Sequence, residues 1–142
     1  MKIVIINGPN LNLLGVRETA VYGSVSFEKY LITLREIFPS IDLHYFQSNI
    51  EGEIVSAIQQ HGFSSAGIVL NPAAYTHTSI AIGDAVAAVE APVIEVHISN
   101  IFSSEEFRKH SFVSASSKAV VTGMGLKGYE AAIRFLVDAV KG

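Results

Sequence analysis

The 142-residue sequence contains no cysteine, no tryptophan and no long apolar run. The missing cysteines exclude a disulfide framework, a thiol nucleophile and a cysteine-ligated metal site. No apolar stretch approaches the roughly 18 residues of a membrane-spanning helix, and Asn7 and Gly8 interrupt the first one. We therefore expect a soluble cytoplasmic protein with no membrane partner.

An excess of positive charge is also missing. Ten Lys and Arg residues against 13 Asp and Glu residues leave a formal net charge of −3, and the basic residues are scattered. Proteins that bind nucleic acids usually carry a clustered basic surface, so we expect no nucleic-acid partner. By contrast, hydrophobic residues make up 49% of the sequence, which is enough for a packed core. Length and composition predict a single domain over residues 1–142.

An apolar run from Ile3 to Ile6 leads directly into a polar loop that extends to Gly23. Four consecutive β-branched residues predict a strand covered on both faces, as in a parallel sheet, where ligands bind beyond the carboxyl ends of the strands. We interpret the loop as an active-site lid; the alternative is a surface loop in which Asn, Gly and Pro only form turns. The loop carries hydrogen-bonding and ionisable side chains: Asn10, Asn12, Arg17 and Tyr22.

Strand and helix patterns alternate along the chain. Apolar runs and alternation predict further strands at 41–46, 67–70, 93–97 and 119–122. Helical spacing predicts helices at about 27–38, 50–62, 78–89 and 129–140, the first of them capped by Ser24 or Ser26. Ser103 and Glu106 form a capping-box pattern that predicts a short helix through Phe107. The alternation predicts an α/β fold, a flavodoxin-like doubly wound sheet of about five parallel strands in three layers, α/β/α.

Polar residues follow four of the predicted strands. Because the carboxyl ends of parallel strands meet at one edge of a sheet, these side chains should line one crevice, which predicts a site for a small polar ligand. The residues are Asn7, Asn10 and Asn12; Gln47, Ser48 and Asn49; Asn71, Tyr75, Thr76 and His77; and Glu95, His97, Ser99 and Asn100.

The fifth strand is followed by Gly123, Gly125 and Gly128, which have the spacing of a dinucleotide-binding fingerprint. That fingerprint normally follows the first strand of its unit, so we interpret these glycines as allowing a helix to pack closely on a strand. The first loop also lacks the hydroxyl run expected for a flavin phosphate and the Gly-Lys-Ser or Gly-Lys-Thr of a nucleoside-triphosphate site. The strand ends carry Asn instead of the clustered Asp of a receiver domain.

Glu95 and His97 lie two residues apart in a predicted strand and so share one face. The carboxylate would orient the imidazole and favour its charged form, which suits a general acid. The alternative is a pair of satisfied core residues, and a metal site is less favoured because no third ligand has convincing spacing. His77 is a second candidate, although it could instead cap the following helix. The other histidines are interpreted as structural or solvent-facing: His44, His61 and His110.

Tyr22 is a poor base at neutral pH unless a cation favours its phenolate, and Arg17 lies on the same loop. A tyrosine base, a histidine acid and uncharged donors such as Asn10 suit the removal of a proton beside a carbonyl. An enolate would be held by hydrogen bonds while a hydroxyl departs. This chemistry would require no metal and no organic cofactor.

Five motifs occur in order across the whole chain: Asn7–Gly15 with Arg17 and Tyr22–Gly23, Gln47–Gly52, Asn71–Ser79, Glu95–Asn100 and Glu105–Arg108. Together they closely resemble the type II 3-dehydroquinate dehydratase family. The resemblance implies a flavodoxin-like fold and the trans dehydration of 3-dehydroquinate to 3-dehydroshikimate through an enolate, in the shikimate route to chorismate and aromatic amino acids. It also implies a homododecamer, a tetramer of trimers, without a cofactor.

The resemblance further implies roles for individual residues. Tyr22 would accept the proton, while Arg17 would favour its phenolate and stabilise the transition state. His97 would donate a proton to the departing hydroxyl, Glu95 would orient His97, and Asn10 would hold a water that supports the enolate oxygen. Substrate hydroxyls would be bound by Asn71, His77 and Arg108, the substrate carboxylate by the backbone amides of Ile98 and Ser99, and Asp84 would reach the site of a neighbouring subunit.

Three positions depart from the usual family pattern. Thr19 stands where proline is common, Gly83 where an arginine often precedes the helix Asp, and Ser104 where an arginine often precedes the Glu-Glu-Phe-Arg motif. We expect a looser lid and fewer ion pairs at subunit contacts, with the reaction unchanged.

One alternative belongs to a different class: a non-catalytic flavodoxin-like module that binds a small polyhydroxy acid in the same crevice. Tyr22 discriminates between the two, because a binding module has no need for a base beside an arginine. The substitution Tyr22→Phe should abolish dehydration only in an enzyme. The resemblance does not decide between a biosynthetic role and a role in quinate breakdown.

Overall fold

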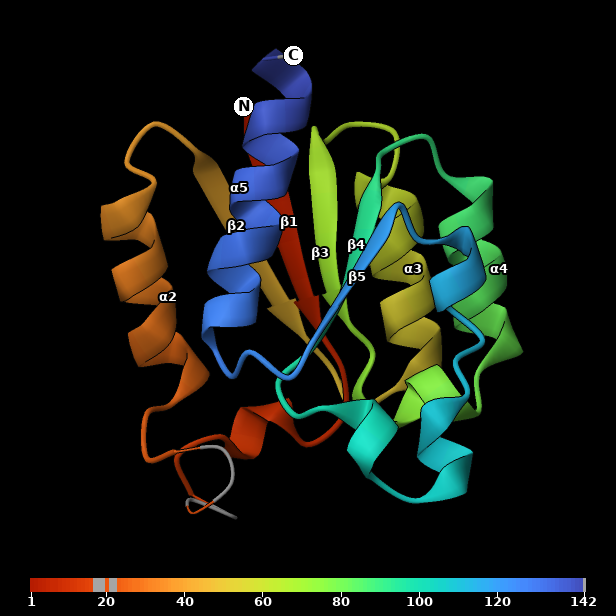
Figure 1. Ribbon diagram of the computed structural model, residues 1–142. Coiled ribbons are helices and arrows are strands. Elements are labelled where there is room, and N and C mark those ends of the chain that lie inside the picture. Colours follow the sequence, from red (N-terminus) through yellow and green to blue (C-terminus); the bar gives the residue numbers. More distant parts are fainter. Residues whose placement is uncertain (17–19, 21–22, 142) are drawn as a thin grey trace.

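The computed structural model describes residues 1–16, 20 and 23–141, and it contains a five-stranded parallel sheet (Figure 1). The strand order is β2-β1-β3-β4-β5, and every neighbouring pair is parallel. This arrangement confirms the predicted flavodoxin-like fold. The strands are β1 (Lys2–Asn7), β2 (Asp42–Gln47), β3 (Gly67–Asn71), β4 (Val93–His97) and β5 (Ala119–Thr122).

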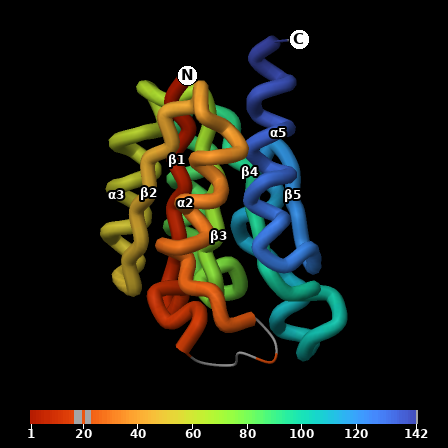
Figure 2. The backbone as a smooth tube through the Cα atoms, turned by 90° about the vertical axis from the view of Figure 1, so that its left-hand side faces the viewer, coloured from red at the N-terminus to blue at the C-terminus, as the bar shows by residue number. Residues whose placement is uncertain are grey.

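Among the described residues, helices cover both faces of the sheet, two on each. Figure 2 shows α3 and α5 on opposite sides of the sheet. The helices α2 (Phe27–Ile37) and α5 (Lys127–Lys141) share one hydrophobic cluster, and α3 (Glu51–His61) and α4 (Ile80–Ala88) share the other. Three layers, α/β/α, result.

Strand β1 shows why its apolar run is continuous. Ile3 and Ile5 pack in the cluster of α2 and α5, while Val4 and Ile6 pack in the cluster of α3 and α4. Because successive side chains of a strand point to opposite faces, a strand between two helical layers needs apolar residues at every position. All four side chains are fully buried.

Several sequence signals act as predicted at the helix ends. The hydroxyl of Ser26 accepts a hydrogen bond from the backbone N–H of Lys29 and caps α2. Ser79 caps α4 in the same way, through the N–H of Ile82, so this helix begins two residues later than Thr78. Two apolar residues near helix ends, Ile37 and Val140, are exposed instead of contributing to the core.

The predicted capping box of Ser103 and Glu106 is wrong. The segment forms two short 3-10 helices, η3 (Ile101–Ser103) and η4 (Glu106–Lys109). The hydroxyl of Ser103 donates to the carbonyl of Asn100, and the carboxylate of Glu106 accepts from Lys109. The reason is local: the side chain of Asn100 already accepts from the N–H of Phe102 and starts the first turn itself.

Short 3-10 helices gather at the carboxyl ends of the strands, at the bottom of Figure 1. η1 (Leu11–Leu13) follows β1, η2 (Ala73–His77) follows β3, and η3 and η4 follow β4, whereas η5 (Ser114–Ser116) precedes β5. The amino terminus lies at the opposite end of the sheet (Figure 1). No helix among the described residues is long and apolar enough to cross a membrane.

Candidate active site

A cavity of about 170 Å³ opens where β1, β3 and β4 end. Its lining joins segments that are far apart in the sequence, as the sequence analysis expects for one edge of a parallel sheet. Seven of the predicted site residues line it: Asn10, Asn71, His77, His97, Ile98, Ser99 and Arg108.

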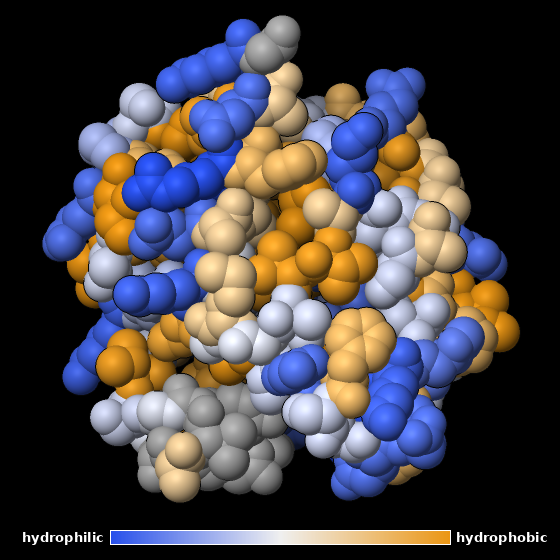
Figure 3. Space-filling model, viewed as in Figure 1, coloured by the Kyte–Doolittle hydropathy of each residue, from blue (hydrophilic) through white to orange (hydrophobic). Residues whose placement is uncertain are grey.

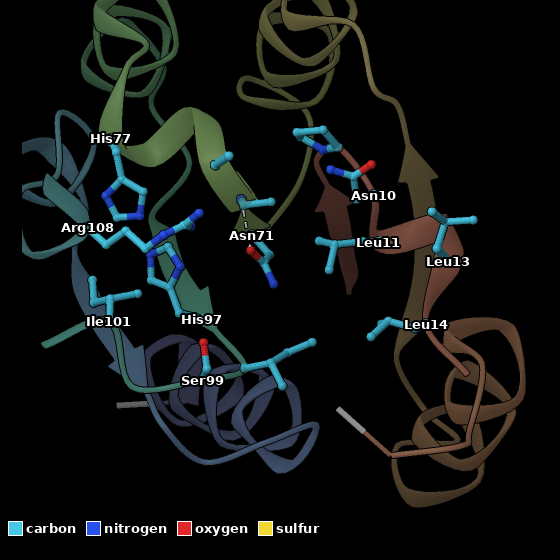
Figure 4. A pocket seen from close by; sticks show the side chains of 14 residues that line it. Asn10, Leu11, Leu13, Leu14, Asn71, His77, His97, Ser99, Ile101 and Arg108 are labelled. Carbon is cyan, nitrogen blue, oxygen red and sulfur yellow. Dashed lines mark hydrogen bonds between the residues drawn. The ribbon is translucent and has the colours of Figure 1, made fainter. Parts of the chain in front are cut away.

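One wall of this cavity is apolar, which the sequence analysis missed. Leu11, Leu13 and Leu14, in and next to η1, face His77 and His97 across the cavity (Figure 4). These leucines belong to the Asn7–Gly15 motif, in which only the polar residues were predicted to contact a ligand. An apolar wall opposite a polar one can cover the carbon skeleton of a ligand whose oxygens contact the other side.

Glu95 and His97 form a buried pair on the polar side of the cavity. Nε2 of His97 donates a hydrogen bond of 2.6 Å to Oε2 of Glu95, which is fully buried. The hydroxyl of Thr76 lies 3.5 Å from the same nitrogen. Since Nε2 is occupied in this way, Nδ1 is the ring nitrogen left to serve a ligand.

Two serines supply the other hydrogen bonds to Glu95. The hydroxyls of Ser111 and Ser114 lie 3.1 Å and 2.8 Å from Oε1 and donate to it. Ser111 also accepts from the backbone N–H groups of Val113 and Ser114, which orients its hydroxyl. A buried carboxylate is costly unless donors compensate it, and these serines provide that compensation. Neither serine could be predicted from the sequence, because they follow Glu95 by 16 and 19 positions and no local pattern connects them to it.

The polar end of β2 supports the first loop and does not line the cavity, which corrects an expectation. Gln47 donates to the carbonyl of Gly8 at 3.1 Å, and Asn49 accepts from the backbone N–H of Asn10 at 3.0 Å. Ser48 is buried and donates to the carboxylate of Glu53. These contacts hold Asn10 in a left-handed conformation, with φ of 69°, at the start of η1.

His77 and Arg108 belong to two segments that meet beside His97. Nδ1 of His77 donates to the carbonyl of His110 at 2.8 Å, so His77 connects η2 to the end of η4 and does not cap α4. Nε of Arg108 lies 3.1 Å from the carboxylate of Glu105. The hydroxyl of Ser104 donates to the same carboxylate and, together with Arg108, holds the pKa of Glu105 below its usual range.

Asp84 and Gly83 lie on α4, away from the cavity. Asp84 is exposed and does not contribute to the lining. A Cβ atom at Gly83 would overlap the backbone carbonyl of Phe112, which packs directly against it. Glycine stands here where the family often has arginine, and it fits the close approach of this backbone.

Arg17, Thr19 and Tyr22 lie outside the described residues. The predicted role of Tyr22 as the base, the predicted role of Arg17 as its cation and the predicted effect of Thr19 on the lid therefore stay predictions. Within residues 1–16, 20 and 23–141, no group of three or more His, Asp or Glu side chains is arranged to hold a metal ion.

Comparisons with known proteins agree with this geometry. The family described as Dehydroquinase class II matches residues 1–137. The 3-dehydroquinate dehydratase of Aliarcobacter butzleri is 48% identical to this chain, covering 99% of the chain and 87% of that protein. The catabolic 3-dehydroquinase of Verticillium alfalfae is 46% identical, covering 99% of this chain and 95% of that protein.

A solved structure shows the same fold. The crystal structure of the type II dehydroquinase from Butyrivibrio crossotus is 47% identical in sequence, covers 96% of this chain and 97% of its own, and superposes with a TM-score of 0.89. The sequence match and the structural match both extend over nearly the whole chain. This chain belongs to the class II dehydroquinase family.

Proposed function

We propose that this chain catalyses the dehydration of 3-dehydroquinate to 3-dehydroshikimate, a step of the shikimate pathway. Membership of the class II dehydroquinase family supports this activity. The structural observation that carries the proposal is the buried Glu95–His97 pair, of which His97 lines the cavity. Residues 1–142 would act as a single catalytic domain.

In the proposed reaction, the phenolate of Tyr22 removes a proton from the carbon beside the ketone, which breaks a C–H bond and leaves an enolate. The enolate then forms the new C=C bond and expels the hydroxyl of the next carbon. His97 donates a proton to this hydroxyl, so that water leaves and the neutral imidazole remains. Arg17 would favour the phenolate, and a water held by Asn10 would support the enolate oxygen.

The environment of His97 supports its role as the acid. The carboxylate of Glu95 binds Nε2 and fixes the orientation of the ring, which leaves Nδ1 for the substrate. Ser111 and Ser114 donate hydrogen bonds to the carboxylate, which offset the cost of its burial and hold it in place. Because Glu95 and His97 are both buried, little water competes for the transferred proton.

Donors around the cavity would bind the oxygens of the substrate. Asn71, His77 and Arg108 would bind hydroxyls, and the backbone amides of Ile98 and Ser99 would bind the carboxylate. All five residues line the cavity, which supports these assignments. The leucines of η1 would cover the carbon ring on the opposite side.

The proposal includes a cytoplasmic homododecamer, a tetramer of trimers, in which Asp84 contacts the site of a neighbouring subunit. The exposure of Asp84 outside its own cavity supports such a contact. Apolar side chains also gather on one face, over α5 and the edge strand β5 (Figure 3). Val120, Met124 and Phe135 are exposed there, as expected for a surface that pairs with another subunit.

The test is ultraviolet absorbance of the conjugated enone when purified, chelator-treated protein meets 3-dehydroquinate. We expect signal from the wild type and near-silence from Tyr22→Phe, because phenylalanine has no group that can accept the proton. Tyr30→Phe serves as the matched control and should retain activity, since Tyr30 does not line the cavity. A folded wild-type protein that gives no signal would overturn the proposal and favour a binding module.

A further inference from the structure

We infer that Tyr129, at the start of α5, is a positioning residue that acts with the backbone N–H of Ala73 to hold the Asn71 amide in one orientation towards the substrate. The inference rests on the proposed function, because it concerns how Asn71 is presented to the proposed substrate. It also explains the glycine-rich turn before α5, which the proposed reaction does not use.

The hydroxyl of Tyr129 lies between two asparagines at the ends of neighbouring strands. Asn7 of β1 and Asn71 of β3 are register partners in the sheet. Oη of Tyr129 is 2.8 Å from Oδ1 of Asn7 and 2.9 Å from Nδ2 of Asn71. All three side chains are buried, so water does not substitute for either hydrogen bond.

The fourth member of this chain of hydrogen bonds is a backbone group. The N–H of Ala73 donates to Oδ1 of Asn71 at 3.0 Å, and a backbone N–H can only donate. Oδ1 of Asn71 must therefore face Ala73, which leaves Nδ2 to face Tyr129. Nδ2 donates to the Tyr129 oxygen, and the Tyr129 proton goes to Oδ1 of Asn7. Every hydrogen bond in the series then has one possible direction.

This direction determines what Asn71 offers to a ligand. A flipped amide would place its oxygen against the Tyr129 oxygen and its NH₂ against the N–H of Ala73, two repulsive contacts in a buried site. Figure 4 shows the amide oxygen of Asn71 turned towards η2, with the amide nitrogen pointing away from it. One hydrogen of Nδ2 binds Tyr129, and the second is available to an acceptor oxygen such as a substrate hydroxyl.

Tyr129 also stays protonated, as this series requires. Burial raises the pKa of its phenol far above the ordinary value of a tyrosine. The ring packs edge-on against Phe27, with centroids 4.8 Å apart, so the hydroxyl is directed from a rigid support.

The glycine-rich turn explains how Tyr129 reaches the strand ends. Gly123 and Gly125 have φ values of 85° and 62°, which favour glycine, and the N–H of Gly125 donates to the carbonyl of Ile98 at 3.0 Å. Gly128 lies against Val96 and Val121, where a Cβ atom would be 3.3 Å from each side chain. The turn therefore starts α5 close to the sheet, and the next residue is Tyr129.

The test compares Tyr129→Phe with Tyr30→Phe in steady-state kinetics on 3-dehydroquinate. The first variant removes the bridging hydroxyl and leaves the packing of the ring, so we expect KM to rise by about 5- to 30-fold. The pH dependence of kcat should stay that of the wild type, because the Glu95–His97 pair is unchanged. Tyr30 packs against the same rings, but its hydroxyl has no partner among the described residues. Its replacement should leave KM unchanged.

Asn7→Leu provides a second variant should Tyr129→Phe fail to fold. It removes the acceptor of the Tyr129 proton, so the hydroxyl is no longer directed to accept from Asn71, the amide is held less firmly and KM should again rise. The double variant should raise KM no further than the stronger single variant, because both changes break one series of hydrogen bonds.

Wild-type KM in the folded variants, accompanied only by a lower unfolding temperature, would show a purely structural role for Tyr129 and overturn the inference. Failure of the proposed function has a different signature, since the wild type itself would not convert 3-dehydroquinate. That result would overturn the proposed function and this inference together.

Discussion

The hydroxyl of Ser114 lies 2.8 Å from Oε1 of Glu95 and donates a hydrogen bond to this buried carboxylate. Ser111 donates to the same oxygen, and His97 binds the other. The proposed acid is therefore oriented by a carboxylate that is itself oriented by a segment 16 to 19 residues away. Four predictions follow from this site and its surroundings.

Replacing Ser114 by alanine should lower kcat. The change removes one donor to a charged buried acceptor, which corresponds to about 1.5 to 3 kcal/mol, or a loss of roughly 10- to 150-fold. KM should change little, because Ser114 does not line the cavity. Ser116→Ala is the matched control, since Ser116 is exposed on the same short helix. Equal kcat values for the two variants would contradict a role for Ser114 in orienting Glu95.

Replacing Glu95 by glutamine should lower kcat more strongly, by about 100-fold, because the proposed acid His97 loses the carboxylate that binds its Nε2. The amide has almost the same size as the carboxylate, so circular dichroism should show an intact fold. Product release can be separated from chemistry by single-turnover measurements of enone absorbance. A single-turnover rate within twofold of the wild type would show that the charge of Glu95 does not assist His97.

Two glycines should respond to alanine in opposite directions. A Cβ atom at Gly8 would lie 2.5 Å from the carbonyl oxygen of Pro72, so Gly8→Ala should lower the free energy of unfolding by about 1 to 3 kcal/mol. Gly52 lies in α3 with no atom within 4 Å of an added Cβ. Gly52→Ala should raise the free energy of unfolding by about 0.5 to 1 kcal/mol, since alanine favours a helix. Urea unfolding of both variants measures this contrast, and a loss of stability at Gly52 would contradict it.

His61 should make the protein less stable as the solution becomes mildly acidic. Burial of its ring lowers the pKa of His61, and the nearby charges of Lys2 and His44 lower it further. The unfolded chain therefore binds more protons than the folded chain below about pH 6.5. Above that pH His61 does not lower the free energy of unfolding, and below it the free energy of unfolding declines as the pH falls towards the folded pKa.

The measurement for His61 is the free energy of unfolding at pH 7.5 and pH 5.5 for the wild type and for His61→Gln. The other ionisable groups are common to both proteins, so the difference between the two pH dependences reports on His61. We expect the variant to lose less stability on acidification. A larger loss in the variant would show that the folded protein instead favours the charged form of His61.

Much of this protein could be predicted from its sequence, because the relevant signals are local. The alternating apolar runs and helical spacings predicted the five strands and the four main helices to within a few residues. The rule that parallel strands present their carboxyl ends at one edge brought five predicted residues together at one cavity, and the family resemblance added Ile98 and Arg108. The motifs predicted the family, which the comparisons confirm.

Other features were decided only by the tertiary structure, because they depend on contacts between residues that are distant in the sequence. Nothing near Glu95 indicates that Ser111 and Ser114 bind it, and the helical spacing over 129–140 does not indicate a partner for the hydroxyl of Tyr129. Its hydroxyl meets Asn7 across 122 positions of the chain. Even the local capping box at Ser103 was wrong, because Asn100 formed the competing turn. Periodicity determines which face of an element is buried, whereas the packing of distant elements decides which polar group each buried side chain finds.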